Sequence, residues 1–189
     1  KSAGDGGALT IAITNDSHSP LADVSAHVLD IRAQLEKSVA ATKTFVTSIV
    51  SGLLLLAHWT RNEALLTSLQ DFPELSAKAI SCNWQCLADR MRYDGSLYVL
   101  GRGPSFAIAN EVALKFKETC QIQAEAFSSA EVLHGPVSIV GKNYPVLALI
   151  ARDKSENSVA GVAHDLAVQG ADVFATSPEL DAVQNLPIV

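Results

Sequence analysis

The chain has 189 residues, of which 48% are hydrophobic and 18% are charged, and its formal net charge is −6 at pH 7. This composition supplies enough apolar side chains for a sizeable core and excludes a disordered chain. The acidic balance argues against nucleic acid as the main partner. The three cysteines lack the spacing of a disulfide framework or a zinc site. We therefore expect a globular cytoplasmic protein without a bound metal.

The first third of the chain predicts strands at 9–14 and 28–31, separated by a Ser-Pro turn. The most apolar segment, Phe45–Trp59, is about 15 residues long and contains three hydroxyl side chains, so it is too short to span a membrane. It predicts a buried or subunit-interface helix. Residues 62–70 and 74–92 predict two helices that bridge the two halves of the chain and are interrupted by Phe72-Pro73.

A strand, a glycine loop and a helix follow. Asp94-Gly95 predicts a turn, and 96–100 predicts a buried parallel strand. The glycine loop then leads into a helix at 105–120, with Ser105 as its N-cap. Sequence periodicity therefore places the end of a strand, a loop and a helix N-terminus together, which is where open α/β sheets bind ligands.

One face of this helix carries Glu111, Lys115 and Glu118, opposite its apolar side. Such a face is commonly a solvated one with i, i+4 ion pairs. Its position after a strand and a glycine loop also fits a site for an anionic ligand. Periodicity alone leaves both interpretations open.

A second motif lies further along the chain. Residues 121–126 predict a short extended piece, and Ser128 and Glu131 fit a capping box that opens a very short helix. His134 falls in the last turn of that helix, where the backbone dipole favours the imidazolium form. A lone histidine there is commonly a C-terminal cap. Beside a glutamate and a lysine it is a candidate acid/base.

The remaining pattern predicts a strand at 145–150, a helix at 156–169 and a strand at 171–176. Stretches 3–31 and 169–189 share a Ser-Pro, Asp and Val core after a strand, which indicates an internal repeat. We expect an α/β protein with two tandem copies of one subdomain, each a three-layer α/β/α sandwich with a mainly parallel, flavodoxin-like sheet. The predicted divisions are 1–60, 61–94 and 95–189, with the first copy incomplete at its N-terminus.

Two blocks of this sequence resemble a known family. The run GRG-x₇-E-x₃-K-x₂-E followed by AEAF-x₃-E-x₂-HGP is similar to the isomerase domain of glucosamine-6-phosphate synthase and to stand-alone sugar isomerase (SIS) proteins. Residues 36–45 resemble that family's E-x-x-V-A-S-T-K-x-F segment. Ala41 stands where the family has serine, which removes one polar group from the segment.

The resemblance implies roles for particular residues. Glu118 would move a proton between sugar carbons 1 and 2, Lys115 would assist it, and His134 would open the sugar ring from a neighbouring subunit. The chain would therefore work as a homodimer with a shared active site. The substrate-binding segment would comprise Glu36, Val39, Ala40, Ala41 and Thr42. The glycine loop, with Gly101, Arg102, Gly103 and Ser105, is a separate candidate, because an arginine between two glycines suits a phosphate. The family's second glycine loop is not usually its catalytic phosphate cradle, so a regulatory ligand and an ordinary surface role both stay open.

The resemblance also implies a function. We expect a phosphosugar isomerase or amino-sugar-phosphate deaminase that acts on a small sugar phosphate, without a cofactor and without nucleic acid or membrane partners. The open alternatives are the isomerase domain of a glutamine–fructose-6-phosphate aminotransferase and a sugar-phosphate sensor without turnover. We also expect a chain cut at both ends, with the family's phosphate-binding serine loop and its C-terminal lysine outside it.

Overall fold

The structure is a computed structural model that describes residues 1–91, 95–177 and 179–189. It separates into two compact units, residues 1–76 and 77–189. Asp94 of the predicted turn and the last residue of the helix predicted at 74–92 lie outside the described residues, as does position 178 of the repeated motif. Each unit is described by itself.

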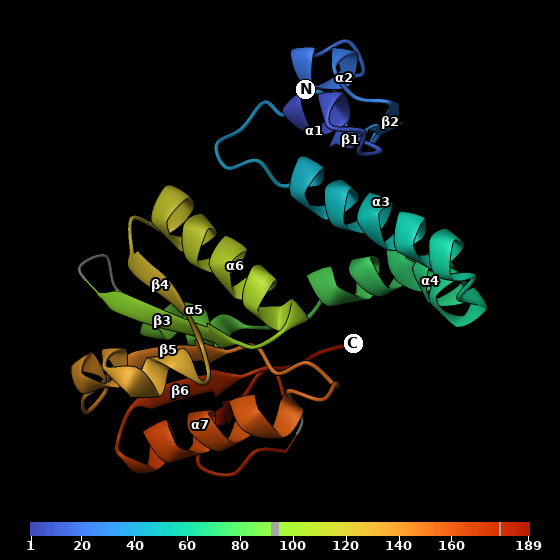
Figure 1. Cartoon of the computed structure of the whole chain (residues 1–189). Helices are drawn as coiled ribbons and strands as arrows, with labels where there is room; N and C mark the ends of the chain where they lie inside the picture. The colour runs from blue at the N-terminus through green and yellow to red at the C-terminus, as the bar shows by residue number, and fades with distance from the viewer. Residues whose placement is uncertain (92–94, 178) are drawn as a thin grey trace. The chain divides into compact units, whose positions relative to one another are not determined.

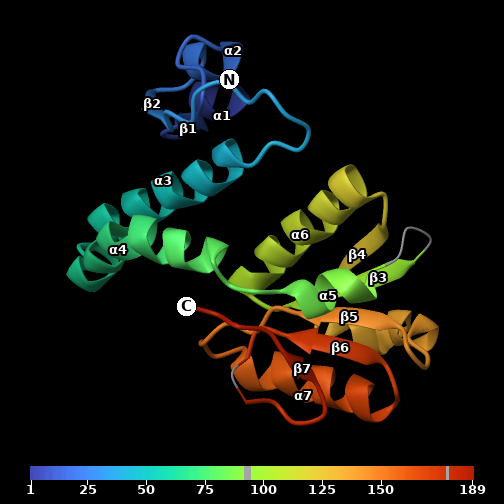
Figure 2. The same cartoon turned by 180° about the vertical axis from the view of Figure 1, so that it is seen from behind.

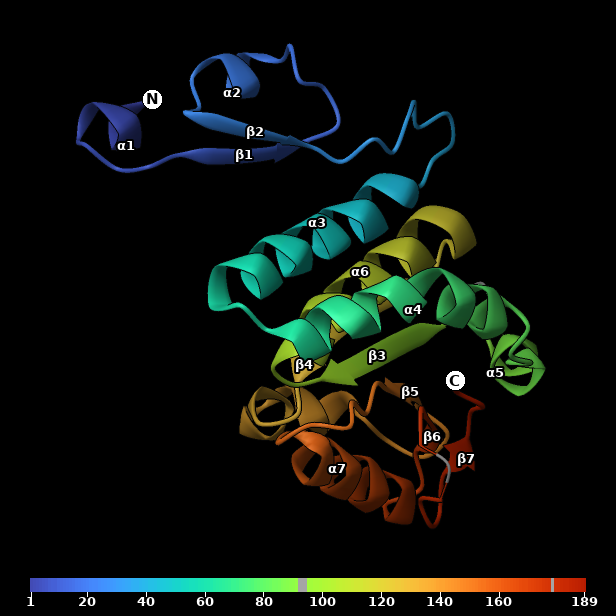
Figure 3. The ribbon, with the colours of Figure 1, turned by 90° about the vertical axis from the view of Figure 1, so that its right-hand side faces the viewer.

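The first unit holds two parallel strands, β1 (Ile11–Thr14) and β2 (His27–Asp30), which lie side by side in Figure 3. The other elements are the short helices α1 (Ser2–Asp5) and α2 (Pro20–Asp23), the long helix α3 (Lys43–Thr60) and most of α4 (Glu63–Ile80). Both predicted strands and the helix predicted at 45–59 are confirmed. Among the residues of α3 only Ala57 is buried, so the helix is not a buried one, and its place in a subunit interface stays a prediction.

The predicted break at Phe72-Pro73 is wrong. Helix α4 runs through Pro73, and the chain leaves the helix only after Ile80. Proline removes one backbone donor from a helix but its fixed φ is helical. The Ser76 hydroxyl donates to the carbonyl of Phe72 at 2.7 Å, next to this position. A separate short helix, α5 (Gln85–Arg90), follows.

The second unit is built on a parallel sheet of five strands in the order β4-β3-β5-β6-β7. The strands are β3 (Ser96–Gly101), β4 (Gln123–Ser128), β5 (Pro145–Ala148), β6 (Asp172–Ala175) and β7 (Gln184–Asn185). The chain passes from β3 outward to β4, then returns across β3 to β5. The direction of winding therefore switches between β3 and β5, which leaves a crevice at the carboxyl ends of these two strands.

Helices cover both faces of this sheet, as Figures 1 and 2 show. On one face, α5 and α6 (Pro104–Cys120) pack Leu87, Ala109 and Ala113 against Leu97, Val99 and Phe174. On the other, α7 (Glu156–Val168) packs Val159, Ala163 and Leu166 against Leu100, Val146 and Ala148. The predicted α/β/α layering with a parallel sheet is confirmed for this unit. The tandem repeat stays a prediction.

The start of α6 differs from the prediction. Gly103, not Ser105, is its N-cap, and Pro104 occupies the first turn. Ser105 lies inside the helix, where its hydroxyl accepts from the N–H of Arg102 at 3.0 Å. It also contacts the carbonyl of Arg102 at 3.1 Å. Because Pro104 is the first helical residue, the N-cap is Gly103. The Ser105 hydroxyl therefore bonds to the backbone of Arg102 in the loop and does not cap the helix.

The end of β3 and the first turn of α6 are in very close contact at Gly101. A Cβ placed on Gly101 would lie 2.6 Å from the backbone oxygen of Ser105. Backbone atoms cannot rotate away from such a contact, so only glycine fits here.

We expect Gly101→Ala to destabilise the chain by about 1–3 kcal/mol, since overpacking forces the helix off the strand. Gly141→Ala is the matched control, because a Cβ at Gly141 meets nothing within 4 Å. Thermal unfolding of both variants followed by circular dichroism measures the effect. Equal midpoints for the two variants would show that the contact at Gly101 is not restrictive.

Candidate active site

The charged face of α6 is a connected ionic cluster. The ammonium of Lys115 lies 2.6 Å from a carboxylate oxygen of Glu111 and 3.3 Å from one of Glu118. The three side chains are 19–32% exposed, so the cluster is largely sheltered and still open to a ligand. Their spacing of four and three residues brings them together on successive turns of one helix.

The cluster is asymmetric. Glu111 makes the shorter contact with Lys115 and is 19% exposed, whereas Glu118 makes the longer one and is 32% exposed. The hydrogen bond with Glu111, followed by that with Glu118, raises the pKa of Lys115 above its ordinary value against the opposing effect of burial. The ammonium is therefore held charged mainly by Glu111, which leaves Glu118 the freer carboxylate.

Sequence reasoning placed Glu111 on this face but did not count it among the catalytic candidates. The structure makes it the nearest partner of Lys115. The signal was present in the sequence, because a glutamate four residues before a lysine is the favoured orientation for a helical ion pair. We therefore include Glu111 in the site as the residue that holds Lys115.

His134 lies at the end of η1 (Glu131–His134), a single 3₁₀ turn followed by a second one, η2 (Pro136–Ile139). Its side chain is exposed, and within the described part of the chain it forms no hydrogen bond or ion pair. The structure thus brings Lys115 and Glu118 together but gives His134 no contact with either of them. Its role across a subunit interface stays a prediction.

The predicted capping box before His134 is wrong. Strand β4 extends as far as Ser128, and the N-cap of η1 is Ala130, without a side-chain bond. The hydroxyl of Ser128 accepts instead from the N–H of Ala130 at 3.4 Å. Pairing with β3 holds Ser128 in the sheet opposite Gly101, so it cannot open a helix.

The segment predicted to bind substrate lies in the first unit. Glu36, Ala40 and Thr42 line a hollow of about 400 Å³, while Val39 and Ala41 are not among its lining residues. Val39 is highly exposed and Ala40 is buried. The structure therefore brings three of the five predicted residues to one hollow.

Within that hollow Glu36 has a structural task. One of its carboxylate oxygens accepts from the backbone N–H groups of Thr42 and Thr44, at 3.1 and 2.8 Å. The Thr44 hydroxyl donates to the same oxygen at 3.1 Å. These bonds, the Thr44 N–H first, lower the pKa of Glu36. Glu36 thus caps the N-terminus of α3 in place of Thr42, whose own side chain makes no cap.

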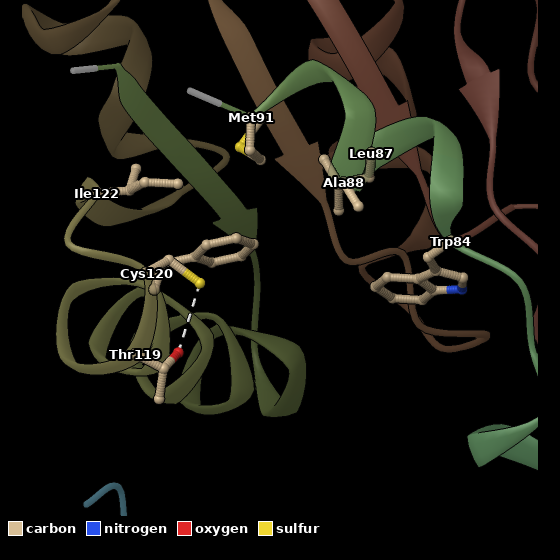
Figure 4. Close-up of a pocket in the computed structure, with 8 residues that line it drawn as sticks. Trp84, Leu87, Ala88, Met91, Thr119, Cys120 and Ile122 are labelled. Atoms are coloured by element: carbon tan, nitrogen blue, oxygen red, sulfur yellow. Dashed lines mark hydrogen bonds between the residues drawn. The ribbon is translucent and has the colours of Figure 1, made fainter. Parts of the chain in front are cut away.

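An apolar hollow of about 400 Å³ lies between α5 and the end of α6 (Figure 4). Its lining includes Trp84, Leu87, Phe116 and Cys120. The dashed line in Figure 4 marks the hydrogen bond between Thr119 Oγ1 and Cys120 Sγ, at 3.5 Å. None of the described residues that line it is charged, so these residues offer no ion-pair partner to an anionic ligand. The charged cluster on α6, which this hollow does not include, is the better candidate site.

Among the described residues, no group of three or more His, Cys, Asp or Glu side chains is placed to hold a metal ion. No helix among them is both long and apolar enough to cross a membrane.

Comparison with known proteins bears on this site directly. A family model described as the SIS domain matches residues 91–177, the part that carries β3, the glycine loop and α6. Residues 91–177 thus resemble SIS domains. The resemblance predicted from the glycine loop, the helix face and the His-Gly-Pro block is confirmed.

The curated proteins that this chain resembles are named as sugar-phosphate enzymes. The chain is 30% identical over its whole length to a glutamine–fructose-6-phosphate aminotransferase (isomerizing) of Halobacterium salinarum, covering 33% of that protein. It is 34% identical to the one of Sulfolobus acidocaldarius, with 76% of this chain and 24% of the relative aligned. The chain thus spans about a quarter to a third of the curated relatives it matches.

Solved structures agree. A crystal structure of a Silicibacter pomeroyi protein assigned to the phosphosugar isomerases has 52% identity and a TM-score of 0.93, covering 98% of this chain and 57% of that one. The C-terminal domain of a glucosamine-fructose-6-phosphate aminotransferase from Francisella tularensis has 26% identity and a TM-score of 0.81, covering 93% and 55%.

The cluster on α6 leads to a first prediction about protonation. Glu111→Gln is expected to lower the pKa of Lys115 further than Glu118→Gln does, since Glu111 makes the shorter contact. The ionic contacts stabilise the fold below the ordinary pKa of lysine and are lost as pH rises through the raised pKa. Titration of the Lys115 side-chain signals by NMR measures this, with Glu131→Gln on η1 as the control. A larger shift from Glu118→Gln would reverse the assignment.

Proposed function

We propose that the protein transfers a proton between C1 and C2 of a hexose 6-phosphate, as a phosphosugar isomerase or an amino-sugar-phosphate deaminase. The observation that carries this proposal is the lysine held between two carboxylates on one face of α6, inside the segment that resembles SIS domains. Carboxylate and ammonium groups placed side by side can serve as a base and as an acid near neutral pH.

Glu118 is the proton carrier in this proposal. It is the carboxylate less tightly held by Lys115, so one of its oxygens is available to a carbon-bound proton. It can remove a proton from one sugar carbon and return it to the neighbouring carbon on the same face. The intermediate is an enediol, or an enolamine when C2 bears an amino group.

Lys115 and His134 assist at the sugar oxygens. The Lys115 ammonium, kept charged by Glu111, donates a hydrogen bond to the oxygen on which negative charge develops. His134 moves a proton between O5 and O1 so that the ring opens. With an amino sugar, reprotonation at C1 leaves an imine at C2. Water adds to that imine and ammonia leaves, giving fructose 6-phosphate.

A second function is the reverse use of the same chemistry, in which an amino group is added to fructose 6-phosphate. It is favoured by the curated relatives at 30–34% identity, whose names describe glutamine–fructose-6-phosphate aminotransferases. Both functions need the same proton transfer at C1 and C2. Assays with glucosamine 6-phosphate on one side, and with fructose 6-phosphate plus ammonia or glutamine on the other, distinguish them.

We expect Glu118→Gln to lower the conversion of glucosamine 6-phosphate to fructose 6-phosphate and ammonia by about 10²–10⁴-fold in the full-length protein, because the amide cannot carry a proton. Binding of the sugar phosphate is expected to persist. Lys117→Gln, an exposed neighbour on α6, is the control and keeps its activity. Tight binding without turnover in the unmodified protein would instead identify a sugar-phosphate sensor.

The predicted homodimer has its own test. If His134 acts in the partner's site, a mixture of Glu118→Gln and His134→Gln chains forms mixed dimers that contain one intact site. Random exchange of equal amounts would restore about a quarter of the unmodified activity, although each variant alone is inactive. No recovery after verified subunit exchange would place both groups in a site within one chain.

A further inference from the structure

The crevice between the carboxyl ends of β3 and β5 holds a hollow that the proposed reaction does not use. It has a volume of about 400 Å³ and is lined by Arg102 and Gly103 from the loop after β3 and by Pro104, the first residue of α6. Asp153, Lys154 and Ser155, from the loop after β5, complete it. This volume falls in the range of small-molecule sites, and the position is the switch point of the sheet.

The hollow presents two basic side chains that lack acidic partners. In the described part of the chain, neither Arg102 nor Lys154 lies within ion-pair distance of a carboxylate. Among the described residues, the Arg102 guanidinium makes one side-chain hydrogen bond, a long one of 3.5 Å to the Ser158 hydroxyl. A guanidinium has five donors in a fork that suits phosphate, so most of its bonding capacity is unused here.

The one carboxylate in the hollow is already engaged. Asp153 accepts from the N–H of Ser155 at 2.7 Å and from its hydroxyl at 2.5 Å. These bonds, the hydroxyl first, lower the pKa of Asp153. The Asp153 carboxylate therefore bonds to the start of α7. The charged residues that line the hollow are two cations, Arg102 and Lys154, and one anion, Asp153, so their net charge is positive. Helices α6 and α7 both begin at this hollow, and their N-terminal dipoles add to the positive potential.

The hollow is distant from the proposed catalytic cluster. Pro104 and Lys115 are 11 residues apart on one helix, which corresponds to about 16 Å along its axis. An anion in the hollow therefore cannot be the same group that meets Lys115 and Glu118.

We propose that this hollow is a second ligand site, which binds a phosphate-bearing small molecule through Arg102 and Lys154. The phosphate would take the unused donors of Arg102 and the ammonium of Lys154. This site does not depend on the proposed catalytic function, because it shares no residue with the cluster on α6.

Two hydrogen bonds connect this hollow to the segment that carries His134. Arg102 contacts the hydroxyl of Ser158, and that hydroxyl lies 3.0 Å from the hydroxyl of Ser129. Ser129 is fully buried and directly precedes Ala130, the N-cap of η1. A ligand that draws Arg102 away from Ser158 would therefore alter a contact at the base of the turn that ends at His134.

Inorganic phosphate is the probe that tests the proposal. It is titrated into the ¹⁵N-labelled chain at constant ionic strength, with chloride as the reference anion, and the amide signals of Gly103 and Ser155 are followed. We expect saturable shifts at both, and binding at least about tenfold weaker in the double variant Arg102→Gln/Lys154→Gln, which loses two charge-assisted contacts. The control Lys117→Gln/Lys142→Gln removes the same charge elsewhere and is expected to bind as the unmodified chain does.

Three results would overturn the second site. They are shifts no larger than those with chloride, shifts that persist undiminished in Arg102→Gln/Lys154→Gln, and shifts confined to the segment around Lys115. Spectra that are otherwise unchanged verify the fold of each variant. Glu118→Gln is expected to keep the full response, so failure of the catalytic proposal would leave this result intact.

Discussion

The close approach of α6 to the end of β3 is the constraint on which the rest of the second unit depends. Gly101 allows the first turn of the helix to contact the strand backbone, and the small side chains of Ala109 and Ala113 continue that contact along the sheet. With these residues fully buried, the helix can present only one other face to a ligand. Glu111, Lys115 and Glu118 occupy it. A packing requirement and a chemical requirement are thus met by two faces of one helix.

The contact between α6 and the end of β3 also fixes where the two proposed sites lie, namely the hollow at Arg102 and the charged cluster at Lys115. A helix that starts at the switch point of a parallel sheet places its N-terminus in a crevice, where backbone donors and Arg102 favour an anion. Three turns later the same helix carries the lysine and its two carboxylates, which suit proton transfer. Separation along the helix means that the ligand in the crevice and the sugar at Lys115 and Glu118 share no contact residue. It also leaves the loop between β3 and α6 free to respond to a ligand without disturbing the ion pairs.

Much of this could be predicted from the sequence because it follows from periodicity. The sequence predicts strands at 96–100 and 171–176, close to the observed β3 and β6, and helices close to α3, α6 and α7. Short apolar runs indicate the buried strands, and apolar residues at helical spacing indicate α6. The predictions that were wrong concern residues whose type fits two different structural roles. Ser105 and Ser128 look like caps, but Pro104 starts the helix one residue earlier and pairing with β3 keeps Ser128 in the sheet. Pro73 looks like a break, although α4 continues through it. Spacing placed Lys115 near Glu118, but only the structure shows that Glu111 is its closer partner. The shared active site, the homodimer and the cytoplasmic location stay predictions.

The central claim is that Glu118 carries a proton at C1 and C2 of a hexose 6-phosphate. The most direct measurement is to incubate fructose 6-phosphate with the full-length protein in D₂O and to follow the two C1 hydrogens by NMR. A carboxylate on one face of the sugar exchanges only one of them, and this exchange needs no nitrogen donor and no net turnover. We predict deuterium at a single C1 position, and none when Glu118→Gln replaces the unmodified protein. Deuterium at both positions, or equal exchange in Glu118→Gln, would contradict the account.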